Sequence, residues 1–377
     1  MVLKNSEFCG IIIIMIYFDN AASCKPHKQA VEVFNSVTAE HFSNPSALHK
    51  GGIEAEKVIT AAKETILERL PRGGDLIFTS GATESNNLAI FNAVLARKKN
   101  NIVITAVEHP SVRNAAEHFA ATRGYELKRI VPRGEVTEQA VIDAVDKHTA
   151  LVSVISVCGE TGIVFDTNCI YEEVKGRYPD CIVHVDSVQS FTRLTGEDLP
   201  NADLISISAH KIGGIAGVGG LYVKDKIRLT PMLHGGGQQG GRRSGTLPTA
   251  LIAAFGKAVE VSSEYCDYID LYKRLNDGLH RLGLRTNHRH YTHLSHIVNF
   301  SCGVKSEVML HYLAENGVCV SSGSACARGK KSEVLAAYGV ADCNIDTAIR
   351  VSFGHHNTVE EADTFLNILE SGVKKWK

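Results

Sequence analysis

Short apolar runs alternate with amphipathic stretches along the middle of the chain. The runs lie at residues 76–78, 102–107, 151–157, 181–185 and 204–207. Continuous apolar runs of this length are typical of strands that are buried on both faces of a parallel sheet. The stretch 53–70 instead places its apolar residues on one helical stripe, at Ala55, Val58, Ile59, Ala62 and Ile66. The alternation predicts an open, mostly parallel α/β domain.

The two ends of the chain point to a second, smaller domain. Residues 11–18 form an apolar run that predicts a buried strand, and residues 1–14 could be an extension upstream of Met15. We expect a large domain at residues 15–255 and a small α/β domain at residues 256–377. The first part of the chain could also contribute to the small domain.

Four features lead into and through this small domain. Residues 234–245 are rich in glycine, and one helical stretch is predicted from Pro248 to Leu282. A strand is predicted at residues 297–300. Thr358 and Glu361 form a capping-box pair that predicts the start of the last helix.

Composition and charge exclude several classes of protein. The 377 residues carry 40 basic and 41 acidic side chains, so the net charge of −1 argues against binding nucleic acid or a membrane surface by bulk charge. The apolar run at residues 11–18 is too short to span a bilayer. The ten cysteines form no CxxC pair, which leaves zinc-ribbon and thioredoxin interpretations without support. Several of them lie in apolar runs, as expected in a reducing cytosol.

Polar side chains with chemical potential follow the predicted strands. The run at 76–78 leads into Gly81-Ala82-Thr83 before a helix, a turn whose N–H groups suit a phosphate. His109 follows the next strand. Asp186 ends the strand at 181–185, and Lys211 follows the strand at 204–207.

These residues fit one cofactor when they are taken together. Ligands bind at the carboxyl edge of an open α/β sheet, so the turn, the imidazole, the carboxylate and the lysine should lie close together. Each has an ordinary structural interpretation alone. Pyridoxal 5'-phosphate (PLP) needs a lysine for its aldehyde, an Asp for its pyridine nitrogen and a helix N-terminus for its phosphate. The set therefore predicts a PLP site.

The chain resembles the class V aminotransferase family, and within it the cysteine desulfurases of the NifS/IscS group. The resemblance covers about residue 16 to the C-terminus and implies the fold of type I PLP enzymes. Nine segments carry it in order: residues 17–22, 44–46, 78–87, 108–109, 208–211, 234–237, 243–246, 321–326 and 350–354.

The resemblance implies a role for each residue of the site. Lys211 would hold the PLP aldehyde, Asp186 would face the pyridine nitrogen, and His109 would stack over the ring. Gln189 would bond the ring oxygen. The phosphate would be held by Ala82, Thr83, Ser208, His210 and, from the neighbouring subunit of a homodimer, Thr246. Arg350 would bind the substrate carboxylate with a bidentate guanidinium, assisted by Asn44.

Cys326 decides the reaction that the resemblance implies. It ends the small, polar run Ser-Gly-Ser-Ala-Cys, whereas a structural cysteine more usually lies in an apolar run. In the family, this thiol attacks the sulfur of PLP-bound L-cysteine and yields alanine and an enzyme persulfide. Lys211 would move the proton at Cα, and His109 is a candidate acid–base for the thiol. A sulfur-acceptor protein and a cytoplasmic location are implied as well.

The sequence also departs from the family. Gly159 stands where a second Asn normally bonds the ring oxygen, and the stretch after Cys326 is about two residues shorter and more basic than usual, with Arg328, Lys330 and Lys331. Two alternatives therefore stay open. One is a related class V enzyme, such as a selenocysteine lyase or another amino-acid lyase or transaminase. The other is a sulfur-relay or scaffold protein of low activity, which only Gly159 supports.

A cluster of histidines raises the question of a metal. His288, His290, His293 and His296 have ligand-like spacing. No carboxylate or cysteine completes the set, so a surface loop is the default interpretation and we expect no metal.

Overall fold

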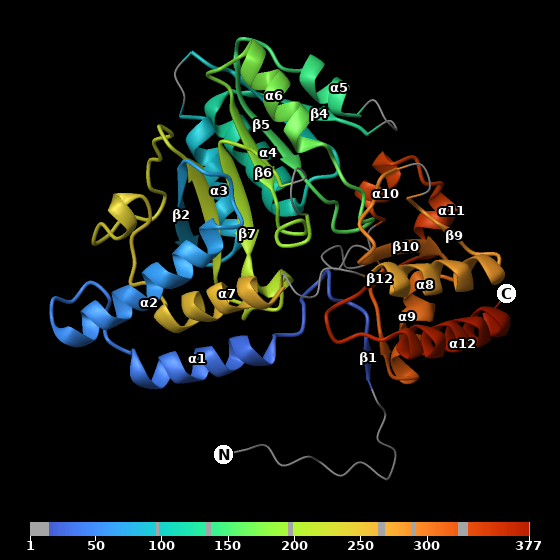
Figure 1. Ribbon diagram of the computed structural model, residues 1–377. Helices are drawn as coiled ribbons and strands as arrows, with labels where there is room; N and C mark the ends of the chain where they lie inside the picture. The colour runs from blue at the N-terminus through green and yellow to red at the C-terminus, as the bar shows by residue number, and fades with distance from the viewer. Residues whose placement is uncertain are drawn as a thin grey trace.

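The protein is described by a computed structural model in which two lobes lie side by side (Figure 1). The structure describes residues 15–95, 98–132, 137–194, 199–262, 268–288, 291–322 and 331–376. The predicted extension at residues 1–14 lies outside the described residues.

A seven-stranded sheet forms the larger lobe. Its order is β2-β8-β7-β6-β5-β3-β4, and β8 alone runs antiparallel to its neighbours. The strands in this order are β2 (Gly74–Thr79), β8 (Gly219–Lys224), β7 (Leu204–Ser208), β6 (Ile182–Asp186), β5 (Thr149–Ile155), β3 (Asn101–Thr105) and β4 (Glu126–Ile130). The sheet is mostly parallel, as the continuous apolar runs predicted.

Helices cover both faces of this sheet, which explains why its inner strands are buried along almost their whole length. Along β3, Val103 joins one core while Ile102 and Ile104 join another, since successive side chains point to opposite faces. The first core is covered by α1 (Lys28–Glu40), α2 (Lys50–Leu67), α5 (Thr137–Asp143), α6 (Thr167–Arg177) and α7 (Thr249–Ser262). The second is covered by α3 (Ala82–Ala93) and α4 (Pro110–Arg123).

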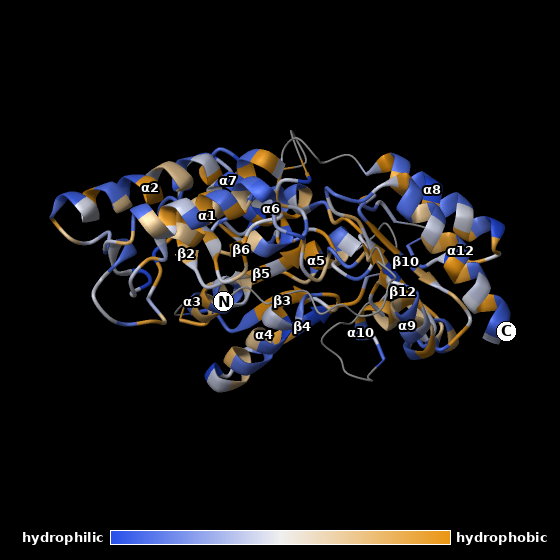
Figure 2. Cartoon of the chain, turned by 90° about the horizontal axis from the view of Figure 1, so that it is seen from below, coloured by the Kyte–Doolittle hydropathy of each residue, from blue (hydrophilic) through white to orange (hydrophobic). Residues whose placement is uncertain are grey.

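The smaller lobe has its own sheets and its own core. A three-stranded antiparallel sheet has the order β12-β10-β9, and β1 pairs with β11 in parallel. The elements are β1 (Ile16–Tyr17), α8 (Ile269–Arg281), β9 (Arg285–Thr286), β10 (Ile297–Ser301), α9 (Ser306–Glu315), β11 (Val318–Cys319), α10 (Glu333–Ala337), α11 (Asp342–Ile345), β12 (Ala348–Ser352) and α12 (Val359–Trp376). Its sheets are largely hydrophobic and its outer helices carry the hydrophilic residues (Figure 2).

The path of the chain between the lobes adds detail to the predicted organisation. Phe18 is fully buried in the core of the smaller lobe, so the described chain begins there before it crosses to α1. The single helix predicted from Pro248 to Leu282 is wrong, because two separate helices, α7 and α8, occupy this stretch. α7 packs on α1 and α2, whereas α8 packs on α12. Residue 256, the predicted boundary, lies within α7.

The predicted capping box opens α12. The backbone N–H of Glu361 donates to Thr358 Oγ1 at 3.3 Å, and the N–H of Thr358 donates to Glu361 Oε2 at 3.1 Å. Two N–H groups that have no partner within the helix are satisfied in this way.

Candidate active site

Lys211 lies at the carboxyl edge of the large sheet, in a short 3₁₀ turn (Ala209–Lys211) that follows β7. Its Nζ donates to the carbonyl oxygens of Ala21 and Ala22 at 2.7 and 2.9 Å. Burial, together with smaller contributions from the nearby Arg350 and Arg193 cations, lowers the pKa of Lys211 to about 8, although Asp186 and Asp19 oppose the shift. A larger share of the amine is therefore neutral near pH 8 than in an ordinary lysine.

Asp186 ends β6 and is buried at the same edge. Its Oδ2 accepts from Asn86 Nδ2 at 2.9 Å, and its Oδ1 accepts from the N–H of Val188 at 3.1 Å. Asn86 also donates to Ser111 Oγ at 2.8 Å. Asn86 lies within the matched run 78–87, but sequence reasoning gave it no role because nothing in the sequence pairs it with Asp186.

His109 caps the N-terminus of α4. Its Nδ1 is 2.7 Å from Ser111 Oγ and accepts from the N–H of Ser111 at 3.2 Å. The ring keeps an exposed face, although the surrounding protein displaces enough water to lower its pKa. The Asp186 charge opposes this shift, while Lys211 adds to it. A neutral imidazole that can accept a proton follows from this balance.

The turn before α3 presents backbone N–H groups next to Gly219 of β8, the residue that pairs with Ser208 of β7. Thr83 is exposed in its first turn, and Ser208 is buried at the end of β7. Gly219 lets β8 approach this turn, because a Cβ on it would be 2.8 Å from the Gly81 Cα. The turn and Ser208 thus meet at one edge, as the sequence predicted for a phosphate site.

Gln189 faces Gly159 across the site. Its Nε2 donates to the Ala21 carbonyl at 2.9 Å, whereas its Oε1 is buried without a hydrogen-bond partner. A Cβ on Gly159 would be 3.4 Å from Gln189 Nε2, an ordinary contact. The side chain that the family carries at this position would therefore point toward Gln189. An orphaned buried oxygen here is the kind of atom that a bound polar ligand satisfies.

His210 lies beside Lys211 and contacts the N-terminal segment. Its Nδ1 is 3.3 Å from Ser23 Oγ. Burial lowers the pKa of His210 to about 4, with smaller contributions from Lys211 and His109. The ring is therefore neutral near pH 7.

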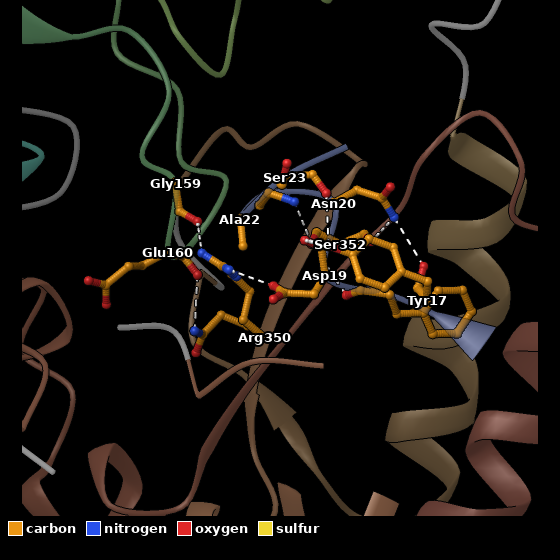
Figure 3. A network of polar contacts seen from close by, with 12 residues as sticks. Tyr17, Asp19, Asn20, Ala22, Ser23, Gly159, Glu160, Arg350 and Ser352 are labelled. Atoms are coloured by element: carbon orange, nitrogen blue, oxygen red, sulfur yellow. Dashed lines mark hydrogen bonds and ion pairs between the residues drawn. The ribbon is translucent and has the colours of Figure 1, made fainter. Parts of the chain in front are cut away.

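Arg350 joins the two lobes on the opposite wall (Figure 3). From β12 its Nη1 donates to the Gly159 carbonyl at 2.8 Å, and its Nη2 contacts Asp19 Oδ1 at 2.8 Å. Its buried Nε has no hydrogen-bond partner. The guanidinium is held in place by Asp19, a residue to which sequence reasoning gave no role.

Two carboxyl groups were also missed, the buried Glu108 next to His109 and the half-buried Glu160 next to Gly159. Glu108 Oε1 accepts from Thr105 Oγ1 at 2.6 Å and from the N–H of Ile155 at 2.9 Å, and burial raises the pKa of Glu108 to about 8. Glu160 Oε2 accepts from Ser332 Oγ at 2.5 Å, and burial raises the pKa of Glu160 to about 7. Their polar type alone predicts solvent exposure, so only the tertiary structure identifies them.

Two predicted site residues, Asn44 and Thr246, make no described contact with this centre, and a third cannot be placed. Cys326 lies outside the described residues. Asn44 lies in the connection between α1 and α2, at the far end of the large lobe from β12 (Figures 1 and 2). Thr246 is exposed after the glycine-rich segment. Nothing in the described structure tests the roles that the resemblance gives them.

The comparisons with known proteins match this arrangement. The family described as "Aminotransferase class-V" matches residues 16–365. The chain belongs to this family. It is 34% identical over 374 residues to a "NifS/IcsS protein homolog" of Lactobacillus delbrueckii subsp. bulgaricus, covering 93% of this chain and 95% of that protein. It is 32% identical to "Cysteine desulfurase IscS 1" of Archaeoglobus fulgidus, over 96% of this chain and 97% of that protein.

Solved structures support the same grouping. A structure described as "NIFS-LIKE PROTEIN" superposes with a TM-score of 0.85 at 28% identity, covering 95% of this chain and 98% of that one. The fold is therefore that of the NifS-like members of the class V family, and the resemblance seen in the sequence is confirmed.

The histidine cluster does not behave as a surface loop. His288 and His296 are buried, and burial lowers the pKa of His288 to about 3. The rings of His288 and His293 lie 3.9 Å apart, while His290 is outside the described residues. Among the residues that the structure describes, no three His, Cys, Asp or Glu side chains are grouped to hold a metal ion. None of the described helices is long and apolar enough to cross a bilayer.

Proposed function

We propose that this class V enzyme is a PLP-dependent cysteine desulfurase that converts L-cysteine to L-alanine and transfers the sulfur to Cys326. The observation that carries the proposal is the position of Lys211 after β7 at the carboxyl edge of the sheet, where burial lowers its pKa to about 8. Relatives named cysteine desulfurase support the activity. A solved structure titled "SspA in complex with cysteine", with a TM-score of 0.78 at 28% identity, supports the substrate class.

The residues at the sheet edge fit PLP. A neutral lysine is available for the aldehyde, and the Asp186 carboxylate, already oriented by Asn86, is available for the pyridine nitrogen. The orphaned Oε1 of Gln189 offers an acceptor for a hydroxyl on the ring. The phosphate would take the α3 N-terminus with Ala82, Thr83, Ser208 and His210, and Thr246 of a second subunit. PLP bound there withdraws electrons from the Cα of an amino acid.

The protein's own groups divide the remaining work. Arg350 binds the substrate carboxylate, since a guanidinium suits a carboxylate and Nε is still unpaired. Lys211 Nζ moves the proton at Cα, and neutral His109 accepts the proton of the Cys326 thiol. In the net reaction the substrate's Cβ–S bond breaks and an S–S bond forms. Enzyme thiol plus cysteine thus becomes enzyme persulfide plus alanine.

The substrate must share Arg350 with the protein. Asp19 and the Gly159 carbonyl already occupy Nη2 and Nη1. A carboxylate that binds Arg350 at Nε and Nη2 replaces the Asp19 contact, and the Gly159 contact then keeps the guanidinium plane oriented. Asp19 therefore holds the arginine ready in the free enzyme.

We further propose a homodimer, a cytoplasmic location and a sulfur-acceptor protein. Asn44 and Thr246 lie on parts of the surface from which a second subunit's site can be completed, and neither reaches Arg350 or Lys211 of its own chain by any contact described. The connection that contains Asn44 also exposes large apolar side chains, Phe42 and Leu48. Such exposed groups are typical of a surface that a partner covers.

The activity test uses purified, PLP-loaded protein, L-cysteine and a thiol reductant. We expect alanine and sulfide in equal amounts, and we expect Cys326→Ala to keep the PLP absorbance while losing both products. Cys343→Ala is the matched control, because this cysteine of the same lobe is exposed and free. A Cys326→Ala variant that still desulfurates L-cysteine rejects the assigned nucleophile.

Gly159 is the one specific observation that favours the low-activity alternative. Gly159 has no side chain to extend toward Gln189. The pyridoxal ring oxygen would therefore lack one hydrogen bond. Protein that binds PLP and L-cysteine but releases neither product would favour the relay or scaffold alternative. Turnover of selenocysteine or another amino acid in its place would favour a related lyase.

A further inference from the structure

The short helix α10 links the two lobes directly after the segment that contains Cys326. Val334 packs into the core of the larger lobe, while the neighbouring Leu335 packs with Ile345 and Ala348 in a separate cluster of the smaller lobe. Tyr338, just past the helix, stacks edge to face on Tyr291 with ring centroids 5.2 Å apart. The start of α10 is thus fixed against the large lobe rather than carried by the small one alone.

Ser332 anchors this start by two hydrogen bonds. Its side chain is buried, and its Oγ accepts from the N–H of Leu335 at 3.0 Å as the N-cap of α10. The same hydroxyl donates its one proton to Glu160 Oε2 at 2.5 Å. A hydrogen bond to a carboxylate is about twice as strong as one between neutral groups. The Ser332–Glu160 bond is therefore a specific link between the lobes.

A second, weaker contact also joins α10 to the large lobe. Glu333 lies 2.8 Å from Arg113 Nη1 and 3.8 Å from Arg129 Nη2, both on the large lobe. Glu333 is 65% exposed, so solvent screens this ion pair and it contributes little. The hydrogen bond from Ser332 to Glu160 is therefore the main contact that holds the start of α10 to the large lobe.

The residues on both sides of the segment that contains Cys326 are held by hydrogen bonds. On the N-terminal side, the backbone of Ser321 pairs with that of Arg350, with N···O distances of 3.1 and 2.6 Å. On the C-terminal side, Ser332 binds Glu160, and the carbonyl of the adjacent Gly159 accepts from Arg350. One flank is thus bonded to the backbone of Arg350, and the other is bonded to the residue next to Gly159, which Arg350 also contacts.

We propose that Glu160 and Ser332 are positioning residues, which fix the base of the Cys326 segment against the large lobe. This inference rests on the proposed function, because it gives the pair a part in sulfur transfer to Cys326. The pair touches neither Lys211 nor Asp186 by any hydrogen bond that the described structure contains. Its removal should therefore slow the thiol's reaction and leave the binding of PLP and L-cysteine intact.

The kinetic test compares three variants of the PLP-loaded full chain. Ser332→Ala removes the anchor, Ser332→Thr restores a hydroxyl, and Thr358→Ala removes a helix cap of α12 that makes no link between the lobes. We expect Ser332→Ala to lower kcat about tenfold at unchanged KM and PLP content, which is the loss expected from one hydrogen bond to a charged group. Ser332→Thr should recover most of this activity, and Thr358→Ala should lower only the Tm. Equal kinetic losses in Ser332→Ala and Thr358→Ala would overturn the inference.

A second measurement is independent of turnover. The rate at which Cys326 is alkylated is followed by peptide mass spectrometry without substrate, with the exposed Cys169 on α6 as internal reference. We expect Ser332→Ala to change the alkylation rate of Cys326 relative to Cys169, and Thr358→Ala to leave it unchanged. An unchanged ratio in Ser332→Ala contradicts the positioning role. If the wild type does not desulfurate L-cysteine, the proposed function fails while this ratio still decides the inference.

Discussion

Individual residues of the candidate site could be proposed from the sequence where a charged side chain or a glycine turn follows a buried strand. A lysine, an aspartate and a glycine turn at the ends of buried strands already indicate PLP, because few structural roles need all three. Asp19, Glu108 and Glu160 could not be found in this way. Each acts through a partner distant in sequence, Arg350, Ile155 or Ser332, and a single sequence does not show which residues meet.

Glu108 leads to a prediction about stability and pH. Its pKa is about 8 in the folded protein and lies near 4.3 in an unfolded chain. Between these values the folded state holds the extra proton, so this group lowers the free energy of unfolding as the pH rises from about 4.5 to 8. Glu108→Gln removes the titration. We expect its urea midpoint, relative to that of the wild type, to increase steadily over this pH range.

The contrast needs a control at a carboxylate that is exposed to solvent. Glu117→Gln serves, since this carboxylate is exposed on α4. A difference between wild type and Glu108→Gln that stays flat from pH 5 to pH 8 would show that the buried carboxyl does not take up a proton.

At the scale of elements, the buried strands were predicted well and the helices between the lobes less well. Strand positions follow from apolar runs, which burial on both faces requires. The break between α7 and α8 has no comparable signal, because residues on both sides continue a helical pattern. The link through α10 was missed for a similar reason: five residues are too few to show a periodicity.

The glycine-rich segment illustrates how side chains fix an element that has little regular structure. The side-chain amide of Gln239 bonds both the N–H and the carbonyl of Phe78 on edge strand β2, at 2.7 and 2.9 Å. Arg243 forms a bidentate pair with Glu84 in the first turn of α3, at 2.8 and 3.1 Å. These contacts hold the chain just before Thr246 against the start of the proposed phosphate site.

Arg243→Ala should therefore weaken PLP binding in the neighbouring subunit's site, which Thr246 is proposed to complete. We expect the dissociation constant for PLP to rise about tenfold, because a half-buried charged pair is lost, while far-UV circular dichroism stays the same. Arg177→Ala, which breaks an exposed pair with Glu173 on α6, is the matched control and should change neither quantity. Equal PLP affinity in Arg243→Ala and wild type would exclude a role for this segment in cofactor binding.

At the scale of the whole molecule, two cores share one site. The large lobe supplies Lys211 and Asp186, and the small lobe supplies Arg350. From the sequence we expect a large and a small domain that meet at residue 256, a position that lies within α7. The crossing of the chain at Phe18 explains why the N-terminal segment lies between the lobes. A second subunit cannot be derived from one chain's pattern, because its contacts leave no periodic signal.

The exposed apolar residues between α1 and α2 test the proposed dimer. Phe42 and Leu48 are 83% and 95% exposed, and Leu48 lines a hollow with Pro45 and Ile53. We expect Phe42→Asp with Leu48→Asp to raise the dimer dissociation constant about thirtyfold or more, measured by sedimentation. Ile269→Asp, a similar change on the exposed start of α8, is the control. A wild-type monomer at micromolar concentration would reject the dimer itself.

The hydrogen bonds that hold Ser321 and Ser332 limit how far Cys326 can carry the sulfur. Three residues lie between Ser322 and Cys326, so covalent geometry keeps their Cα atoms within about 14 Å of each other. The position to which Cys326 can carry a persulfide is therefore limited by its distance from Ser322. An acceptor must bring its own receiving atom to that place, which favours partners that present it on a protruding loop or tail over partners that bury it in a recess.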